Sequence, residues 1–122
     1  MVVDSYKYKI FAEDQLISNH ALKTKKLRDR IFGLLGKSQL KDNEALIMSP
    51  CFLIDTFFMK YPIDVAFVNR HQKIVALYKN LKPYRMTCLH LTAIEAIEWP
   101  QGTIEKWNLT VGTPLKIEVS HV

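Results

Sequence analysis

Glycine and cysteine are scarce in this chain of 122 residues, which has four glycines and two cysteines. No Gly-x-Ser-x-Gly, P-loop or Gly-x-Gly-x-x-Gly pattern occurs, and this argues against a hydrolase nucleophile elbow and a nucleotide-binding loop. Cys51 and Cys88 do not form a Cys-x-x-Cys pair, so we expect neither redox nor zinc chemistry from them. A disulfide between them would require export, and the sequence leaves that pairing open.

Long apolar runs are also absent. No stretch approaches the roughly 20 residues that span a bilayer, and residues 1–7 lack the basic and apolar regions of a signal peptide. The chain as written is therefore expected to be cytoplasmic. Hydrophobic residues make up 48% and charged residues 24% of the sequence, which predicts one globular domain over residues 1–122.

Acidic residues are missing between Val65 and Ile94, although the net charge of the whole chain is only +5. This segment contains five cations and two tyrosines: Arg70, Lys73, Lys79, Lys82, Arg85, Tyr78 and Tyr84. Together with a basic helix face, such a stretch can bind phosphates or nucleic acid, with tyrosines as stacking platforms. A solvated face with a charged edge strand is the favoured interpretation, so weak polyanion binding remains an alternative.

The sequence is rich in β-type patterns. Strands are predicted over residues 3–11, 15–18, 45–48, 52–58, 63–68, 73–78, 89–99 and 115–119. Apolar residues at helical spacing predict one amphipathic helix near residues 24–35, with Thr24 as its cap and Gly36 at its end. A short helical turn is expected near residues 103–108. The pattern predicts a mainly β (α+β) domain, either a β-sandwich or a small barrel-like fold.

Six segments occur in a familiar order: Ala21–Thr24, Arg30–Gly36, Thr56–Phe67, Leu81–Arg85, Ile97–Gly102 and Leu109–Gly112. Over about residues 20 to 119, this set resembles the bacterial and archaeal family catalogued as domain of unknown function 192. The resemblance implies a compact, mainly β fold with helix. It implies no enzyme class, because the family has no assigned activity, and many of its members look exported. Asp55 stands where relatives often have histidine, which argues against a histidine-based metal site.

Two acids lie in otherwise apolar strand segments. Asp64 follows Pro62-Ile63 at the start of one predicted strand, and Glu98 precedes Trp99-Pro100 at the end of another. If these strands are neighbours, the two carboxylates converge and can serve as acid and base in a hydrolase or lyase. The structural interpretation, which we favour, is that each carboxylate accepts backbone hydrogen bonds or pairs with Lys60 or Arg85. Catalytic residues therefore stay unknown, with Asp64 and Glu98 as candidates.

No metal or cofactor is predicted from the residue pattern. The four histidines show no i, i+4 pair, and no calcium loop accompanies Asp55. The favoured function is a small accessory or binding domain without a complete catalytic constellation, whose partner is a protein or a small anionic ligand. Its binding surface is predicted at Phe58, Met59, Lys60, Pro83 and Arg85.

Overall fold

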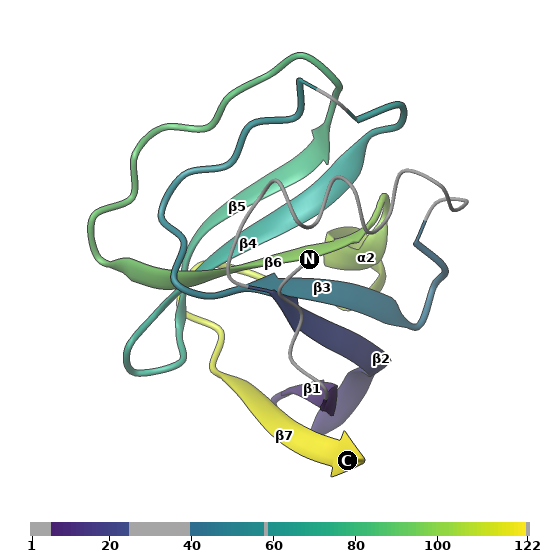
Figure 1. Cartoon of the computed structure of the whole chain (residues 1–122). Helices are drawn as coiled ribbons and strands as arrows, with labels where there is room; N and C mark the ends of the chain where they lie inside the picture. The colour runs from purple at the N-terminus through teal and green to yellow at the C-terminus, as the bar shows by residue number, and fades with distance from the viewer. Residues whose placement is uncertain (1–5, 25–39, 58, 122) are drawn as a thin grey trace.

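A computed structural model of the chain describes residues 6–24, 40–57 and 59–121 (Figure 1). Its strands and helix are β1 (Lys7–Ala12), β2 (Gln15–Thr24), β3 (Glu44–Met48), β4 (Ile63–Asn69), β5 (Ile74–Leu81), β6 (Ala93–Pro100), α2 (Thr103–Lys106) and β7 (Leu115–His121). Among the described residues, no helix is long and apolar enough to cross a membrane.

The seven strands form one mixed sheet in the order β5-β4-β6-β3-β2-β1-β7. Only β2 and β3 are parallel, and they are joined by the long connection 25–43, as parallel pairing requires. The sheet fans out from β5 to β7 and is not closed (Figure 1). Its two edges approach at one corner, where Leu115 N donates to Gln72 O at 2.7 Å and Ile74 N donates to Thr113 O at 3.0 Å.

The mainly β class and the short helical turn are confirmed. The predicted β-sandwich or barrel-like fold is not confirmed, because the strands form a single sheet that does not close. The helix predicted near 24–35 lies outside the described residues, except that Thr24 is the last residue of β2. Residues 52–57 do not form a regular strand, and only Asp55 makes an isolated bridge, to Met86.

Both faces of the central strands are buried. The first core cluster contains residues from all seven strands and α2, including Ile10, Ile47, Ala66, Ile97, Trp99 and Ile104. The second core cluster lies under the β3–β4 and β5–β6 loops and includes Met48, Ile54, Met59, Val65, Phe67 and Ala96. Because side chains alternate between the faces of a strand, β4 sends Ala66 to the first cluster and Val65 to the second.

Within the part of the chain that the structure describes, irregular segments rather than a second sheet cover the second cluster. Ile54 and Met59, both from the loop between β3 and β4, are buried in it. An apolar strand pattern reports that a face is buried, but not whether strands or loops bury it. This is the physical reason for the error in the predicted sandwich.

Candidate binding surface

Two long loops, residues 49–62 between β3 and β4 and residues 82–92 between β5 and β6, run side by side (Figure 1). Backbone hydrogen bonds join them at successive points. His90 N donates to Phe52 O at 2.8 Å and Thr87 N donates to Ile54 O at 2.9 Å. The loops therefore form an irregular antiparallel ribbon.

Thr56 is the strongest link between these loops. Its N–H donates to Arg85 O at 2.8 Å, and its carbonyl accepts from Tyr84 N at 3.0 Å. Its buried hydroxyl donates to Lys82 O at 2.6 Å and accepts from Arg85 N at 2.9 Å. A single threonine thus fixes the 82–85 turn against the first loop, and Tyr84 in that turn has a φ of 61°.

The outer side of this ribbon carries large apolar side chains. Tyr84 is 69% exposed, Met86 56% and Phe57 42%. Further along the same ribbon, Phe52 and Leu91 are exposed as well. Single exposed apolar residues are common on proteins, whereas a set gathered on one surface is typical of an interaction site.

The same two loops also carry positive charge. Lys60, Lys82 and Arg85 are all exposed, and the two loops contain one acid, Asp55. Asp55 Oδ1 accepts a hydrogen bond from Phe57 N at 3.3 Å. We call the exposed set Phe57, Lys60, Lys82, Tyr84, Arg85 and Met86 the two-loop surface.

The five residues predicted to form the binding surface occupy different environments. Lys60 and Arg85 are exposed, and Pro83 is half-buried beside Tyr84. Met59 is buried in the second core cluster and supports the loop from beneath. Phe58 lies outside the described residues. The sequence analysis did not predict a role for Thr56. The hint it offered is that this polar residue stands directly before two aromatic residues in an apolar stretch, where a hydroxyl group needs hydrogen-bond partners.

Asp64 is 1% exposed and accepts three backbone hydrogen bonds. Its Oδ1 accepts from Asn80 N at 2.8 Å. Its Oδ2 accepts from Ile104 N at 2.9 Å and from Gly102 N at 3.2 Å. The β4–β5 register shifts between Ile63 and Val65, and this irregularity lies opposite Asn80, whose φ is 53°. Asp64 therefore joins an irregular point of β5 to the turn that begins α2.

Asp64 and Glu98 are not brought together. In the β4–β6 register, Asp64 lies opposite Trp99, and Val65 lies opposite Glu98. Paired residues share a face and adjacent residues point to opposite faces. Asp64 therefore lies on the side of the first core cluster, with Trp99, and Glu98 on the side of the second, with Val65. The geometry offers no shared pocket in which the two carboxylates could act as an acid–base pair.

The cations of the acid-free stretch are spread along β5 and past both of its ends, and of the two tyrosines only Tyr84 lies with a group of them, in the two-loop surface. Arg70 and Lys73 flank the β4–β5 turn, whereas Lys82 and Arg85 follow the other end of β5, about 25 Å away for a strand of this length. Tyr78 is half-buried, and its hydroxyl lies 2.7 Å from His90 Nε2 and accepts from Cys88 N at 3.3 Å. Burial raises the pKa of the Tyr78 phenol above its ordinary value of 10.0.

Side chains suited to metal binding or thiol chemistry are dispersed. Within residues 6–24, 40–57 and 59–121, no three His, Cys, Asp or Glu side chains gather as a potential metal site. Cys51 is half-buried and Cys88 is exposed, and no disulfide joins them.

The comparisons with known proteins agree with this fold. The model of a family described as "Uncharacterized ACR", domain of unknown function 192 (DUF192), matches residues 12–117. The chain belongs to this family. The DUF192 resemblance seen in the sequence is thereby confirmed, and it extends to β1. No curated protein matches the chain.

Two solved structures share the fold of this DUF192 chain. One, from Novosphingobium aromaticivorans, is a protein of unknown function with a TM-score of 0.70 and 14% identity, and the match covers 90% of this chain and 83% of that one. The other, from Sinorhizobium meliloti, is described as a "putative transcription regulator", with a TM-score of 0.69, 15% identity and 93% and 95% coverage. At this level of identity, the likeness establishes the fold alone.

Proposed function

We propose that this DUF192 chain is a non-catalytic accessory domain that binds an acidic, partly apolar segment of another protein through the two-loop surface. The observation that carries this proposal is the combination of Thr56-centred hydrogen bonds with exposed Phe57 and Tyr84 beside Lys82 and Arg85. A surface that is already held in place loses little conformational entropy when a partner binds.

The side chains of the two-loop surface suit this kind of partner. Phe57, Tyr84 and Met86 offer apolar contact area, and tyrosine and arginine are among the residues that most often dominate binding energy. Lys60, Lys82 and Arg85 would attract carboxylates, and arginine can hold one with two parallel hydrogen bonds. A partner that combines acidic and apolar side chains satisfies both features.

The test is a selection from a displayed library of random peptides with the purified chain as bait. We expect the enriched peptides to contain acidic and apolar residues together, and to lose at least tenfold in affinity for the variant F57S/Y84S. A second variant, K82E/R85E, should bind the same peptides even more weakly than F57S/Y84S does at low salt, where surface charges are least screened.

The matched control for charge is R70E/K73E, which makes the same change at the opposite end of the β4–β5 hairpin. Its affinity for the selected peptides should stay within about twofold of wild type. Peptides without an excess of acids, or peptides that bind F57S/Y84S as tightly as wild type, would rule the proposal out.

Polyanion binding is the competing outcome of the same experiment. The description of the Sinorhizobium meliloti protein as a putative transcription regulator makes DNA a necessary probe. If a double-stranded oligonucleotide binds as tightly as the peptides, with an affinity that falls steeply as salt rises, nucleic acid is the partner and a protein segment is not.

A further inference from the structure

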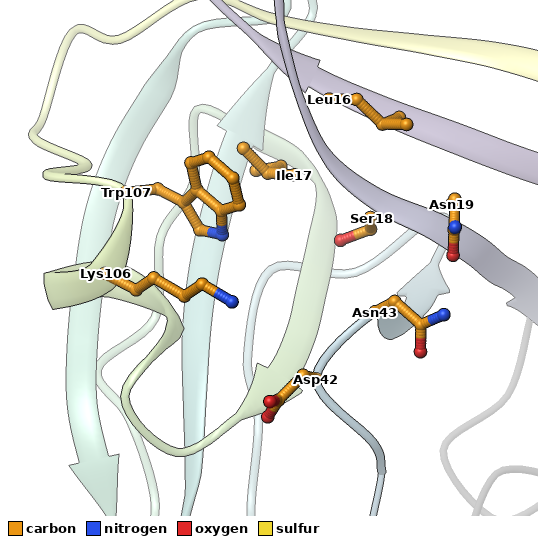
Figure 2. A pocket seen from close by; sticks show the side chains of 8 residues that line it. All are labelled: Leu16, Ile17, Ser18, Asn19, Asp42, Asn43, Lys106 and Trp107. Carbon is orange, nitrogen blue, oxygen red and sulfur yellow. The ribbon is translucent and has the colours of Figure 1, made fainter.

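A cavity of about 130 Å³ lies beside the first core cluster, between α2, β2 and the loop before β3. Figure 2 shows Lys106 and Trp107 on one side and Ser18, Asn19, Asn43 and Asp42 across from them, with the Lys106 nitrogen directed into the space between. Ile17 contributes an apolar wall and belongs to the first core cluster.

Hydrogen-bond donors lie on the α2 side of this cavity. The Lys106 ammonium lies 5.4 Å from the centre of the Trp107 ring, which is within range of a cation–π interaction. Neither the Lys106 ammonium nor the Trp107 indole N–H has a hydrogen-bond partner among the described residues. Two donors are therefore available to a bound acceptor.

Hydrogen-bond acceptors lie on the opposite side. Asn19 Oδ1 is buried and accepts no hydrogen bond within the described part of the chain. Asp42 is exposed and forms no ion pair with Lys106, although both line the cavity. Asn19 Oδ1 is enclosed by protein atoms, so Asp42 is the acceptor that a ligand in the cavity can reach.

Backbone hydrogen bonds hold both sides in place. Asn43 O accepts from Asn19 N and from His20 N, each at 3.1 Å, which fixes the loop carrying Asp42 against β2. On the other side, Asp64 binds the turn from which α2 begins, and Trp107 N donates to Thr103 O at 3.1 Å. Asp64 is thus a positioning residue for Lys106 and Trp107.

We propose that this cavity binds a small zwitterion of the α-amino acid class, with its carboxylate toward Lys106 and Trp107 and its ammonium group toward Asp42. A ligand with one charge would satisfy only one side. The volume of about 130 Å³ is well below the ~300–1,000 Å³ of pockets that enclose drug-sized molecules, so it selects the smallest amino acids. This inference concerns a site separate from the two-loop surface and does not depend on the proposed function.

The test is an NMR titration of the ¹⁵N-labelled chain with glycine, L-alanine and L-serine. We expect a saturable shift of the Trp107 indole N–H, with a Kd of about 1 mM or below for at least one of them. Amides of the 70–73 turn should not move. Propionate and ethylamine, which each lack one of the two charges, should bind at least tenfold more weakly than L-alanine.

Two variants at exposed positions separate binding from folding. Lys106→Gln should weaken L-alanine at least tenfold and leave the weak binding of ethylamine unchanged, whereas Asp42→Asn should weaken L-alanine and leave propionate unchanged. Lys73→Gln, outside the cavity, is the control and should match wild type. The proposal is overturned if none of the three amino acids gives a saturable shift, if the single-charge analogues bind as well as L-alanine, or if Lys106→Gln binds L-alanine normally.

Discussion

Replacing Asp64 with asparagine should destabilise this protein without changing the identity of any exposed side chain. The carboxylate accepts three backbone hydrogen bonds, at 2.8, 2.9 and 3.2 Å, in a site that is 1% exposed. Asparagine has nearly the same shape but only one acceptor oxygen. In either orientation, its NH₂ group faces at least one backbone N–H that Asp64 now satisfies.

The magnitude follows from these contacts. A hydrogen bond to a charged group contributes about 1.5–3 kcal/mol, and a buried donor left without an acceptor costs about 1–3 kcal/mol. We therefore expect Asp64→Asn to lower the free energy of unfolding by about 2–4 kcal/mol, a large part of the ~5–15 kcal/mol typical of a domain. Asp64→Ala should cost more, because it removes all three acceptor contacts.

The assay is urea denaturation followed by circular dichroism and tryptophan fluorescence. Asp55→Asn is the matched control, because the single hydrogen bond of Asp55 Oδ1, to Phe57 N at 3.3 Å, is exposed. It should change the free energy of unfolding by less than about 1 kcal/mol. If Asp64→Asn costs no more than this control, Asp64 is not the anchor that the geometry indicates.

Three further changes test other parts of the structure. Thr56→Val removes the hydroxyl that joins the two loops and should lower the free energy of unfolding by about 1–3 kcal/mol, with faster hydrogen exchange at the Arg85 amide; unchanged exchange there would contradict the role of this side chain. Asn19→Leu removes the buried acceptor and should leave thermal stability equal or higher; a clear loss of stability would mean that Oδ1 is satisfied in solution. Tyr78 has a raised pKa in the folded protein, so its contribution to stability is complete below the ordinary value of 10.0 and is lost as the pH rises through the folded pKa. The free energy of unfolding of Tyr78→Phe should therefore fall less than that of wild type between neutral pH and pH values above 10.0, as measured by urea denaturation. Identical pH profiles for the two proteins would refute the raised pKa of Tyr78.

The sequence predicted those elements whose signals are local. Alternation over residues 115–119 and the polar turn after Asn69 are fixed by neighbouring residues, and both correspond to elements of the sheet. The segment 52–58 has a strand-like composition, but its partner is an irregular loop, so it is paired without becoming a regular strand. No local pattern contains that information.

The relation between Asp64 and Glu98 depends on register. The sequence correctly placed each acid in a buried strand, and the two strands are indeed neighbours. A register shifted by one residue would have put both on one face, because side chains alternate with a period of two. The cavity lined by Asp42 and Lys106 was likewise beyond prediction, since these residues are far apart in sequence and belong to a loop and a short helix.

The most direct test of the proposed function is an NMR map of a peptide selected by this chain. If the two-loop surface binds the peptide, chemical shifts should change at Phe57, Lys60 and residues 82–86, and they should not change at residues 70–73 or in α2. The same titration of F57S/Y84S should give no saturable shifts. Changes centred on any other face, or equal changes in wild type and variant, would contradict the account.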